Sequence, residues 1–198
     1  GPMGLNVSVF LPRQNVRFTG LMQAASLWAD MIGDGGSAAD LYERVLQIDP
    51  GHHLASVELE QLYRQRKSWV KLVDLLLART EFSPDAATRI QLLVSVSETY
   101  EQQLGDRDSA FVTLQAAFRE DYSNDHVAKE LERLATAADK WNELIGEYTQ
   151  VVQGISDPKQ AADLWVKIAR WYDSALRHVD YAIASAQQAL QLDNAHIG

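Results

Sequence analysis

Hydrophobic residues along this chain recur at intervals of three and four, which is the spacing of one face of an α-helix. A clear run consists of Trp165, Ile168, Ala169, Tyr172 and Leu176. No long segment alternates hydrophobic and polar residues in the manner of a β-strand. Stretches rich in glycine, proline, serine, aspartate and asparagine interrupt the pattern at residues 33–37, 49–51, 83–85, 105–108, 122–125 and 154–158. The pattern therefore predicts an all-helical protein whose helices end at these breaks.

The same pattern returns after 72 residues, because a shift of that length aligns like residues without a gap. The aligned sets include Leu21, Leu93 and Trp165; Trp28, Tyr100 and Tyr172; Ala38, Ala110 and Ala182; and Leu46, Phe118 and Leu190. Between them, Trp69 aligns with Trp141. The breaks divide each unit of the period into four helices. We therefore expect about five helical hairpins of roughly 35 residues each, the length that repeats of this architecture typically have.

This arrangement resembles the tetratricopeptide repeat, whose first helix carries a large residue, then a small one, then an aromatic, and whose second helix carries spaced alanines. The matching residues are Trp165, Ala169, Tyr172, Ala182 and Ala189. The resemblance implies a right-handed superhelical solenoid of antiparallel helix hairpins. It also marks a departure, since Glu60 and Glu132 occupy positions where the family has glycine or alanine. We expect those helices to pack at a changed angle.

The ends of the chain fall outside this pattern. Residues 1–3 look like the remnant of an expression tag, and residues 4–20 are predicted to form an irregular arm. Residues 21–198 are predicted to be a single helical repeat domain. Its last residues align with those that precede the helix after Pro50, so we expect a fragment of a longer array.

The tryptophans and small residues have expected places in the core. Trp28, Trp69, Trp141 and Trp165 occupy recurring positions and are predicted to pack inside, whereas Trp171 falls off the main hydrophobic stripe. We expect Trp171 at a hairpin junction or in a binding surface. The recurring alanines are predicted to admit a neighbouring helix at close range; they are Ala110, Ala117, Ala182 and Ala189.

Composition excludes several functions. A net charge of −9 repels a phosphate backbone and argues against nucleic-acid binding. The chain has no cysteine, hence no disulfide and no thiolate metal site, and no hydrophobic run long enough to span a membrane. We expect a cytoplasmic protein that does not associate with membranes.

No motif indicates chemistry. His52 and His53 diverge at a helix start, and acids two residues apart, such as Glu58 and Glu60, point about 200° apart on a helix. No phosphate-binding loop, zinc signature or nucleophile elbow occurs. We therefore expect no enzyme activity, no catalytic residues, no metal and no cofactor.

The resemblance implies that the first helix of each hairpin contributes to a concave surface where a partner binds. The predicted stripe consists of Met22, Val57, Arg64, Val94, Glu98, Lys129, Arg133, Val166, Lys167 and Arg170. Its valines and methionine form a hydrophobic column, and a basic cluster lies in the C-terminal half of the chain, formed by Lys129, Arg133, Lys167 and Arg170. A groove of this kind suits a segment with acidic flanks. The alternative is a set of ordinary solvated charges, neutralised by Glu130, Asp163 and Asp173.

Two functions follow from these observations. The first is a scaffold that binds a segment of a partner protein in its concave groove. The second is a structural spacer or self-assembling part of a large repeat protein, in which exposed terminal hairpins associate. A hydrophobic groove favours the first, and an exposed terminal hairpin favours the second.

Overall fold

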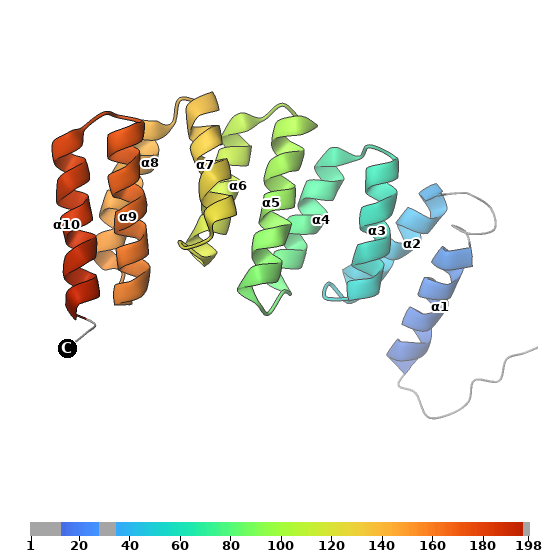
Figure 1. Ribbon diagram of the computed structural model, residues 1–198. Coiled ribbons are helices and arrows are strands. Elements are labelled where there is room, and N and C mark those ends of the chain that lie inside the picture. Colours follow the sequence, from blue (N-terminus) through green and yellow to red (C-terminus); the bar gives the residue numbers. More distant parts are fainter. Residues whose placement is uncertain (1–12, 28–34, 196–198) are drawn as a thin grey trace, which may run out of the picture. The chain divides into compact units, whose positions relative to one another are not determined.

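The computed structural model describes residues 13–27 and 35–195, which form helices joined by short turns (Figure 1). In order they are α1 (Arg13–Leu27), α2 (Gly35–Ile48), α3 (His53–Gln65), α4 (Trp69–Glu81), α5 (Ala86–Gln102), α6 (Arg107–Glu120), α7 (Asp125–Ala137), α8 (Trp141–Val151), the 3-10 helix η2 (Val152–Gly154), α9 (Pro158–Ser174) and α10 (Val179–Ala195). The predicted all-α fold is confirmed, with ten α-helices among the described residues.

Consecutive helices pack in pairs as hairpins, as the sequence predicts. The chain divides into two compact units, unit 1 (Gly1–Phe82) and unit 2 (Ser83–Gly198). Unit 1 contains the hairpins α1–α2 and α3–α4, and unit 2 contains α5–α6, α7–α8 and α9–α10. The five hairpins correspond to the halves of the 72-residue period.

Short polar side chains at the predicted breaks start the helices. Asp85, Asp106, Asn124 and Asp157 each accept a hydrogen bond from a backbone N–H of the first turn that follows. His52 does the same for α3 through its Nδ1, which accepts from the Ala55 N–H at 3.2 Å. These caps satisfy donors that a helix start otherwise leaves unpaired. They explain why each break in the sequence ends one helix and begins another.

The N-terminal boundary differs from the expectation. We predicted an irregular arm as far as residue 20, but α1 already begins at Arg13, so residues 13–20 are helical. Glycine and threonine at positions 20 and 19 have low intrinsic helix propensity, which obscured the helix in the sequence. Packing of α1 along α2 outweighs that preference. The rest of the predicted arm lies outside the described residues.

The small residues of the repeat are buried as predicted. Ala110 and Ala117 of α6 are fully buried, and Ala182 and Ala189 of α10 are nearly so. The Ser97 hydroxyl of α5 reaches the Ala110 carbonyl of α6 at 2.8 Å, which requires a close approach of the two helices. A larger side chain at such a position would push the neighbouring helix away.

The predicted burial of the recurring tryptophans was wrong. Trp69, Trp141 and Trp165 are only half-buried, whereas Trp171 is fully buried; Trp28 lies outside the described residues. Trp69 and Trp141 are the first residues of α4 and α8, so the recurring position lies at a hairpin turn, on the edge of the core.

Trp171 lies in the middle of an aromatic cluster, which we define as Phe118, Tyr122, Tyr148, Trp141 and Trp171. Its ring centroid is 6.0 Å from those of Phe118 and Tyr148 and 6.3 Å from that of Trp141. The cluster joins α6, α8 and α9, which belong to the three consecutive hairpins of unit 2. Of the two places expected for Trp171, the hairpin junction is the correct one.

Glu60 and Glu132, the two departures from the family pattern, both make specific contacts. Glu132 of α7 accepts a hydrogen bond from the buried Trp171 indole N–H at 3.0 Å. Glu60 of α3 pairs with Arg64 on its own helix and with Arg79 on α4. In both cases the carboxylate binds a long side chain from another helix, Arg79 of α4 for Glu60 and Trp171 of α9 for Glu132.

None of the helices in the described part of the chain is long and hydrophobic enough to cross a membrane.

Candidate protein-interaction surface

In unit 2 the helices α5, α7 and α9 lie side by side in one layer, with α6 and α8 behind them (Figure 1). We call their outward surface the first-helix face, defined by Val94 and Glu98 of α5, Lys129 and Arg133 of α7, and Val166, Lys167 and Arg170 of α9. A spacing of four residues places the two members from α5 on one side of that helix, and likewise the two from α7 and the pair Val166 and Arg170 of α9; Lys167 is the neighbour of Val166 in sequence. Two ion pairs, described next, link the three helices across this face.

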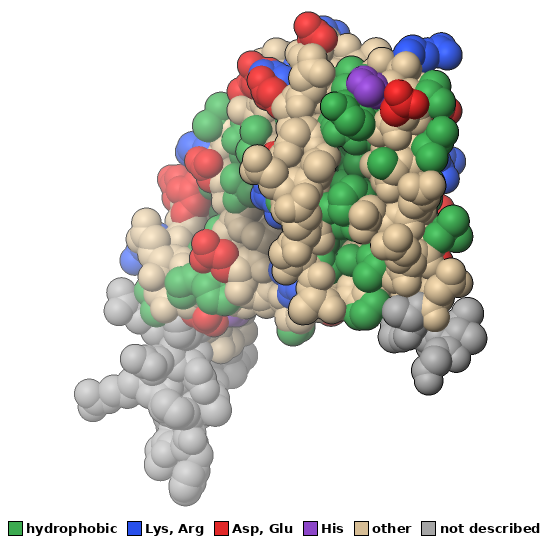
Figure 2. All heavy atoms as spheres, turned by 90° about the vertical axis from the view of Figure 1, so that its left-hand side faces the viewer, with side chains coloured by type: hydrophobic (Ala, Val, Ile, Leu, Met, Phe, Trp, Pro, Cys, Tyr) green, Lys and Arg blue, Asp and Glu red, His purple; other side chains and the backbone are tan. Residues whose placement is uncertain are grey.

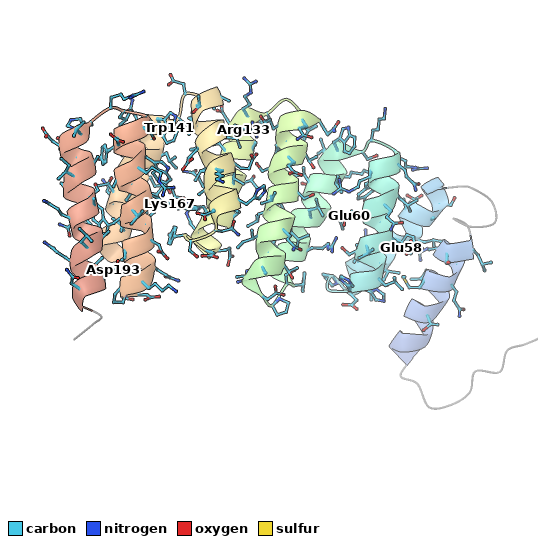
Figure 3. The ribbon with its side chains drawn as sticks, in the orientation of Figure 1. Glu58, Glu60, Arg133, Trp141, Lys167 and Asp193 are labelled. Atoms are coloured by element: carbon cyan, nitrogen blue, oxygen red, sulfur yellow. The ribbon has the colours of Figure 1, made fainter. Side chains whose placement is uncertain are left out.

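Arg133 connects α7 to α5. Its guanidinium donates two hydrogen bonds to the Glu101 carboxylate, at 2.8 and 2.6 Å, and another two to Glu130, at 3.2 and 3.0 Å. These bonds hold the pKa of Glu101 below its ordinary value and raise the pKa of Arg133. The charge of Arg133 is thus already compensated by two carboxylates of its own unit. Figure 3 shows the arginine near the end of α7.

Lys167 connects α9 to α7. Its side chain was predicted to present a charge to a partner, but the residue is only 7% exposed, and its ammonium donates to the Asp125 carboxylate at 2.7 Å. This hydrogen bond lowers the pKa of Asp125, and the nearby charges of Lys129 and Arg170 lower it further. A buried ammonium requires such a partner, because an unpaired charge inside a protein is costly. The label in Figure 3 marks its position beside α7.

Two cations of the predicted cluster remain exposed on the first-helix face. Lys129 of α7 and Arg170 of α9 make no ion pair with another described residue, and both lie close enough to Asp125 to affect its pKa. Val166 lies one helical turn before Arg170 on α9 and is 44% exposed. Lys129, Val166 and Arg170 therefore form a small surface with excess positive charge and a hydrophobic side chain.

The remaining predicted residues are distributed over both units. Val94 is half-buried and Glu98 is exposed in unit 2. Met22 and Val57 are half-buried in unit 1, where Arg64 pairs with Glu60 at 3.0 Å. Of the expected hydrophobic column, two members thus belong to each unit.

A hollow of about 820 Å³ lies at one end of the first-helix face. Its lining is polar and comprises Glu101, Gln102, Gly105, Asp106, Arg107, Asp108, Glu130, Arg133 and Ala138. Sequence analysis placed Arg133 on the predicted stripe and Glu130 beside it, but it did not connect either residue with Glu101. Glu101 and Arg133 are 32 positions apart, and no local pattern joins them. Inside the hollow, the hydrogen-bonded ion pair of Arg133 and Glu101 links α7 to α5.

The histidines and acids of the described part of the chain form no group of three or more suited to holding a metal ion. His52 caps α3, and the His178 ring stacks on that of Tyr181 with 3.8 Å between centroids. Both contacts are structural.

Comparison with known proteins gives similarities in structure. No family model and no curated protein sequence matches the chain. The structure is similar to that of the MamA protein, with a TM-score of 0.45 and 15% identity over 91% of this chain and 93% of that one. It is also similar to YrrB, a TPR protein with an unusual peptide-binding site, with a TM-score of 0.42 and 14% identity over 89% of this chain and 87% of that one. Proteins of the tetratricopeptide kind are thus among the similar structures, as the sequence resemblance implies.

Proposed function

We propose that this chain is a protein-interaction module that binds a partner segment on the first-helix face of unit 2, at Lys129, Val166 and Arg170. The segment has a hydrophobic residue flanked by acids. The observation that supports this proposal is an exposed valine on the same face as two exposed cations, Lys129 and Arg170, that make no ion pair with a described residue. Elsewhere on this face, the cations are neutralised or buried.

The overall charge of the chain makes this location specific. At a net charge of −9, most of the surface repels an acidic segment. Lys129 and Arg170 create a local attraction that steers such a segment to one place, and Val166 adds a hydrophobic contact there. A binding surface of this size has modest affinity, because a few exposed side chains contribute most of the energy.

The test measures binding of synthetic peptides to the full chain by fluorescence anisotropy at two ionic strengths. One panel of peptides has central leucine or valine residues with glutamate flanks, and a matched panel has lysine flanks. We expect the acidic panel to bind and the basic panel to fail. The Lys129→Glu, Arg170→Glu double variant should weaken the acidic panel by about tenfold or more and remove its salt dependence.

The control has the same change of charge at another place. Arg44 and Arg66 are exposed and belong to unit 1, outside the first-helix face as defined, so the Arg44→Glu, Arg66→Glu variant should bind like the wild type. Reversal of Arg133 and Lys167 is unsuitable, because it would place carboxylates against Glu101 and Asp125. Equal binding by both double variants would refute the proposal and leave the structural spacer as the better hypothesis.

A further inference from the structure

One carboxylate of unit 2 lies among three cations. Asp125, the first residue of α7, accepts a hydrogen bond from the Lys167 ammonium of α9 at 2.7 Å. Lys129 follows Asp125 by four residues on α7, and each therefore lies on the same side of that helix. Arg170 follows Lys167 by three residues on α9, with the same consequence. We call these four residues the charge cluster; three positive charges and one negative leave it a net charge of +2.

The two members of the ion pair differ in exposure. The Lys167 side chain is only 9% exposed, whereas the side chain of Asp125, its acceptor, is 77% exposed. An ammonium whose hydrogen-bond acceptor is this exposed lies directly beneath the surface. Because the Asp125 carboxylate already contacts water, turning it away buries no charge. Among the described residues it breaks no hydrogen bond except the one with Lys167.

The internal repeat does not require this arrangement. The residues 72 positions earlier in the chain do not have the charges of their counterparts in the cluster; they are His53, Val57, Ser95 and Glu98. The charge cluster is therefore specific to the contact between α7 and α9. It is not part of the packing that the repeat itself needs.

The helix α10, which also packs on α9, offers no competing cation. Its sequence contains no lysine or arginine, and Figure 2, which looks onto this end of the molecule, shows hydrophobic side chains along it. An acidic segment that approaches α9 is therefore attracted toward the charge cluster.

We propose that Lys167 is a third, concealed cation of the partner site, and that Asp125 occupies it until a carboxylate of the bound segment takes its place. This inference rests on the proposed binding at Lys129, Val166 and Arg170, and it adds the contact that fixes the acid of the segment. The two exposed cations attract the segment, and the incoming carboxylate then exchanges with Asp125 at the Lys167 ammonium. The exchange replaces one ion pair by an equivalent one, so the ammonium keeps a partner throughout. Asp125 thus competes with the partner and limits the affinity for it.

A thermodynamic cycle of Asp125→Asn and Lys167→Met tests the exchange. Binding of the glutamate-flanked peptides to the full chain is measured for the wild type, both single variants and the double variant. Asparagine has the shape of aspartate without its charge, so with lysine at position 167 we expect Asp125→Asn to strengthen binding by about fivefold or more. With methionine there, no ammonium becomes available, and the gain from the same change should be smaller by about threefold or more.

Two features of the variants keep the cycle interpretable. Methionine is a flexible hydrophobic side chain that suits the buried position of Lys167, and it leaves no buried charge unpaired because Asp125 is exposed. Asp173→Asn is the matched control, since it removes the same charge from an exposed position of α9, three residues after Arg170. Its effect on binding should be the same with lysine or methionine at position 167. Circular dichroism of every variant checks that the helical content is retained.

A second measurement uses the unaltered protein and does not depend on the methionine variant. A carbodiimide joins a carboxylate to a lysine amine where the two are in direct contact, and mass spectrometry locates the new amide bond. We expect the bound peptide to be joined to Lys167 as well as to Lys129.

The outcomes separate this inference from the proposed function. Equal gains in the two backgrounds, or peptide joined to Lys129 with none joined to Lys167, overturn the exchange. The proposed function then stands as long as binding still depends on Lys129 and Arg170. If the glutamate-flanked peptides do not bind, or bind without that dependence, the proposed function is refuted and the exchange with it.

Discussion

The aromatic cluster and the first-helix face of unit 2 meet at α9, which contributes to both, but different interactions hold them together. In the cluster, Trp171 is fully buried and its only polar atom has a partner, Glu132. On the face, Arg133 and Lys167 also have partners, but they connect helices by ion pairs at or near the surface. The interior depends on hydrophobic area and packing, whereas the face depends on charge compensation. Removal of a ring and removal of a charge both break contacts between helices. We expect them to lower the free energy of unfolding by very different amounts.

The largest expected effect is that of Trp171→Ala. Removal of a fully buried indole should lower the free energy of unfolding by roughly 3 to 5 kcal/mol, because it deletes hydrophobic area and leaves a cavity among Phe118, Tyr148 and Trp141. Urea denaturation followed by circular dichroism measures the change. Trp141→Ala is the matched control. Because this ring is only half-buried, its removal should lower the free energy of unfolding clearly less. If the two variants lose equal stability, burial does not distinguish the two positions.

Trp171 also shows where sequence analysis reaches its limit. The 72-residue period predicted the helices and hairpins, because hydrophobic spacing and capping residues act locally along the chain. It placed Ala110 and Ala117 correctly for the same reason. It failed for Trp141 and Trp171, because a recurring position can lie at a turn, and because the Glu132 acceptor of Trp171 is 39 residues away.

In the candidate site too, local spacing was predictable from the sequence and contacts between distant residues were not. Lys129 and Arg170 were predicted to be exposed, and they are. Lys167, on the same predicted stripe, is buried, and its ammonium pairs with Asp125, which is 42 positions earlier in the chain. Helical spacing shows which residues lie on one side of a helix. It does not show which of them a neighbouring helix covers. Contacts across hairpins decide which charges remain available to a partner.

An intermediate effect is expected for Ala182→Leu at the contact between α9 and α10. Ala182 is 9% exposed, so a leucine has no free space and must displace a helix or adopt a strained rotamer. The expected loss is roughly 1 to 3 kcal/mol in the free energy of unfolding. Ala184→Leu adds the same atoms at an exposed position of the same helix and should change stability little. Thermal unfolding of the two variants side by side tests this; equal midpoints would mean that α10 does not require a small residue at position 182.

The smallest effect on stability is expected for Arg133→Gln on the first-helix face, although its effect on titration is clear. An ion pair with an exposed guanidinium contributes about 0 to 1 kcal/mol, so the free energy of unfolding at neutral pH should fall only slightly. The pKa of Glu101, however, is lowered in the folded chain chiefly by the hydrogen bonds from Arg133. A carboxyl with a lowered pKa stabilises the fold above its ordinary pKa, and that stabilisation is lost as the pH falls through the lowered value. In the variant the pKa of Glu101 should rise toward its ordinary value, and the acid-dependent loss of stability should become smaller.

An NMR titration of the Glu101 carboxyl measures the change in its pKa. Asp125 is the internal control, since Lys167 rather than Arg133 lowers the pKa of Asp125. A Glu101 pKa that is the same in both proteins would show that the hydrogen bonds between Arg133 and Glu101 do not form in solution, and the link between α7 and α5 would then depend on packing alone.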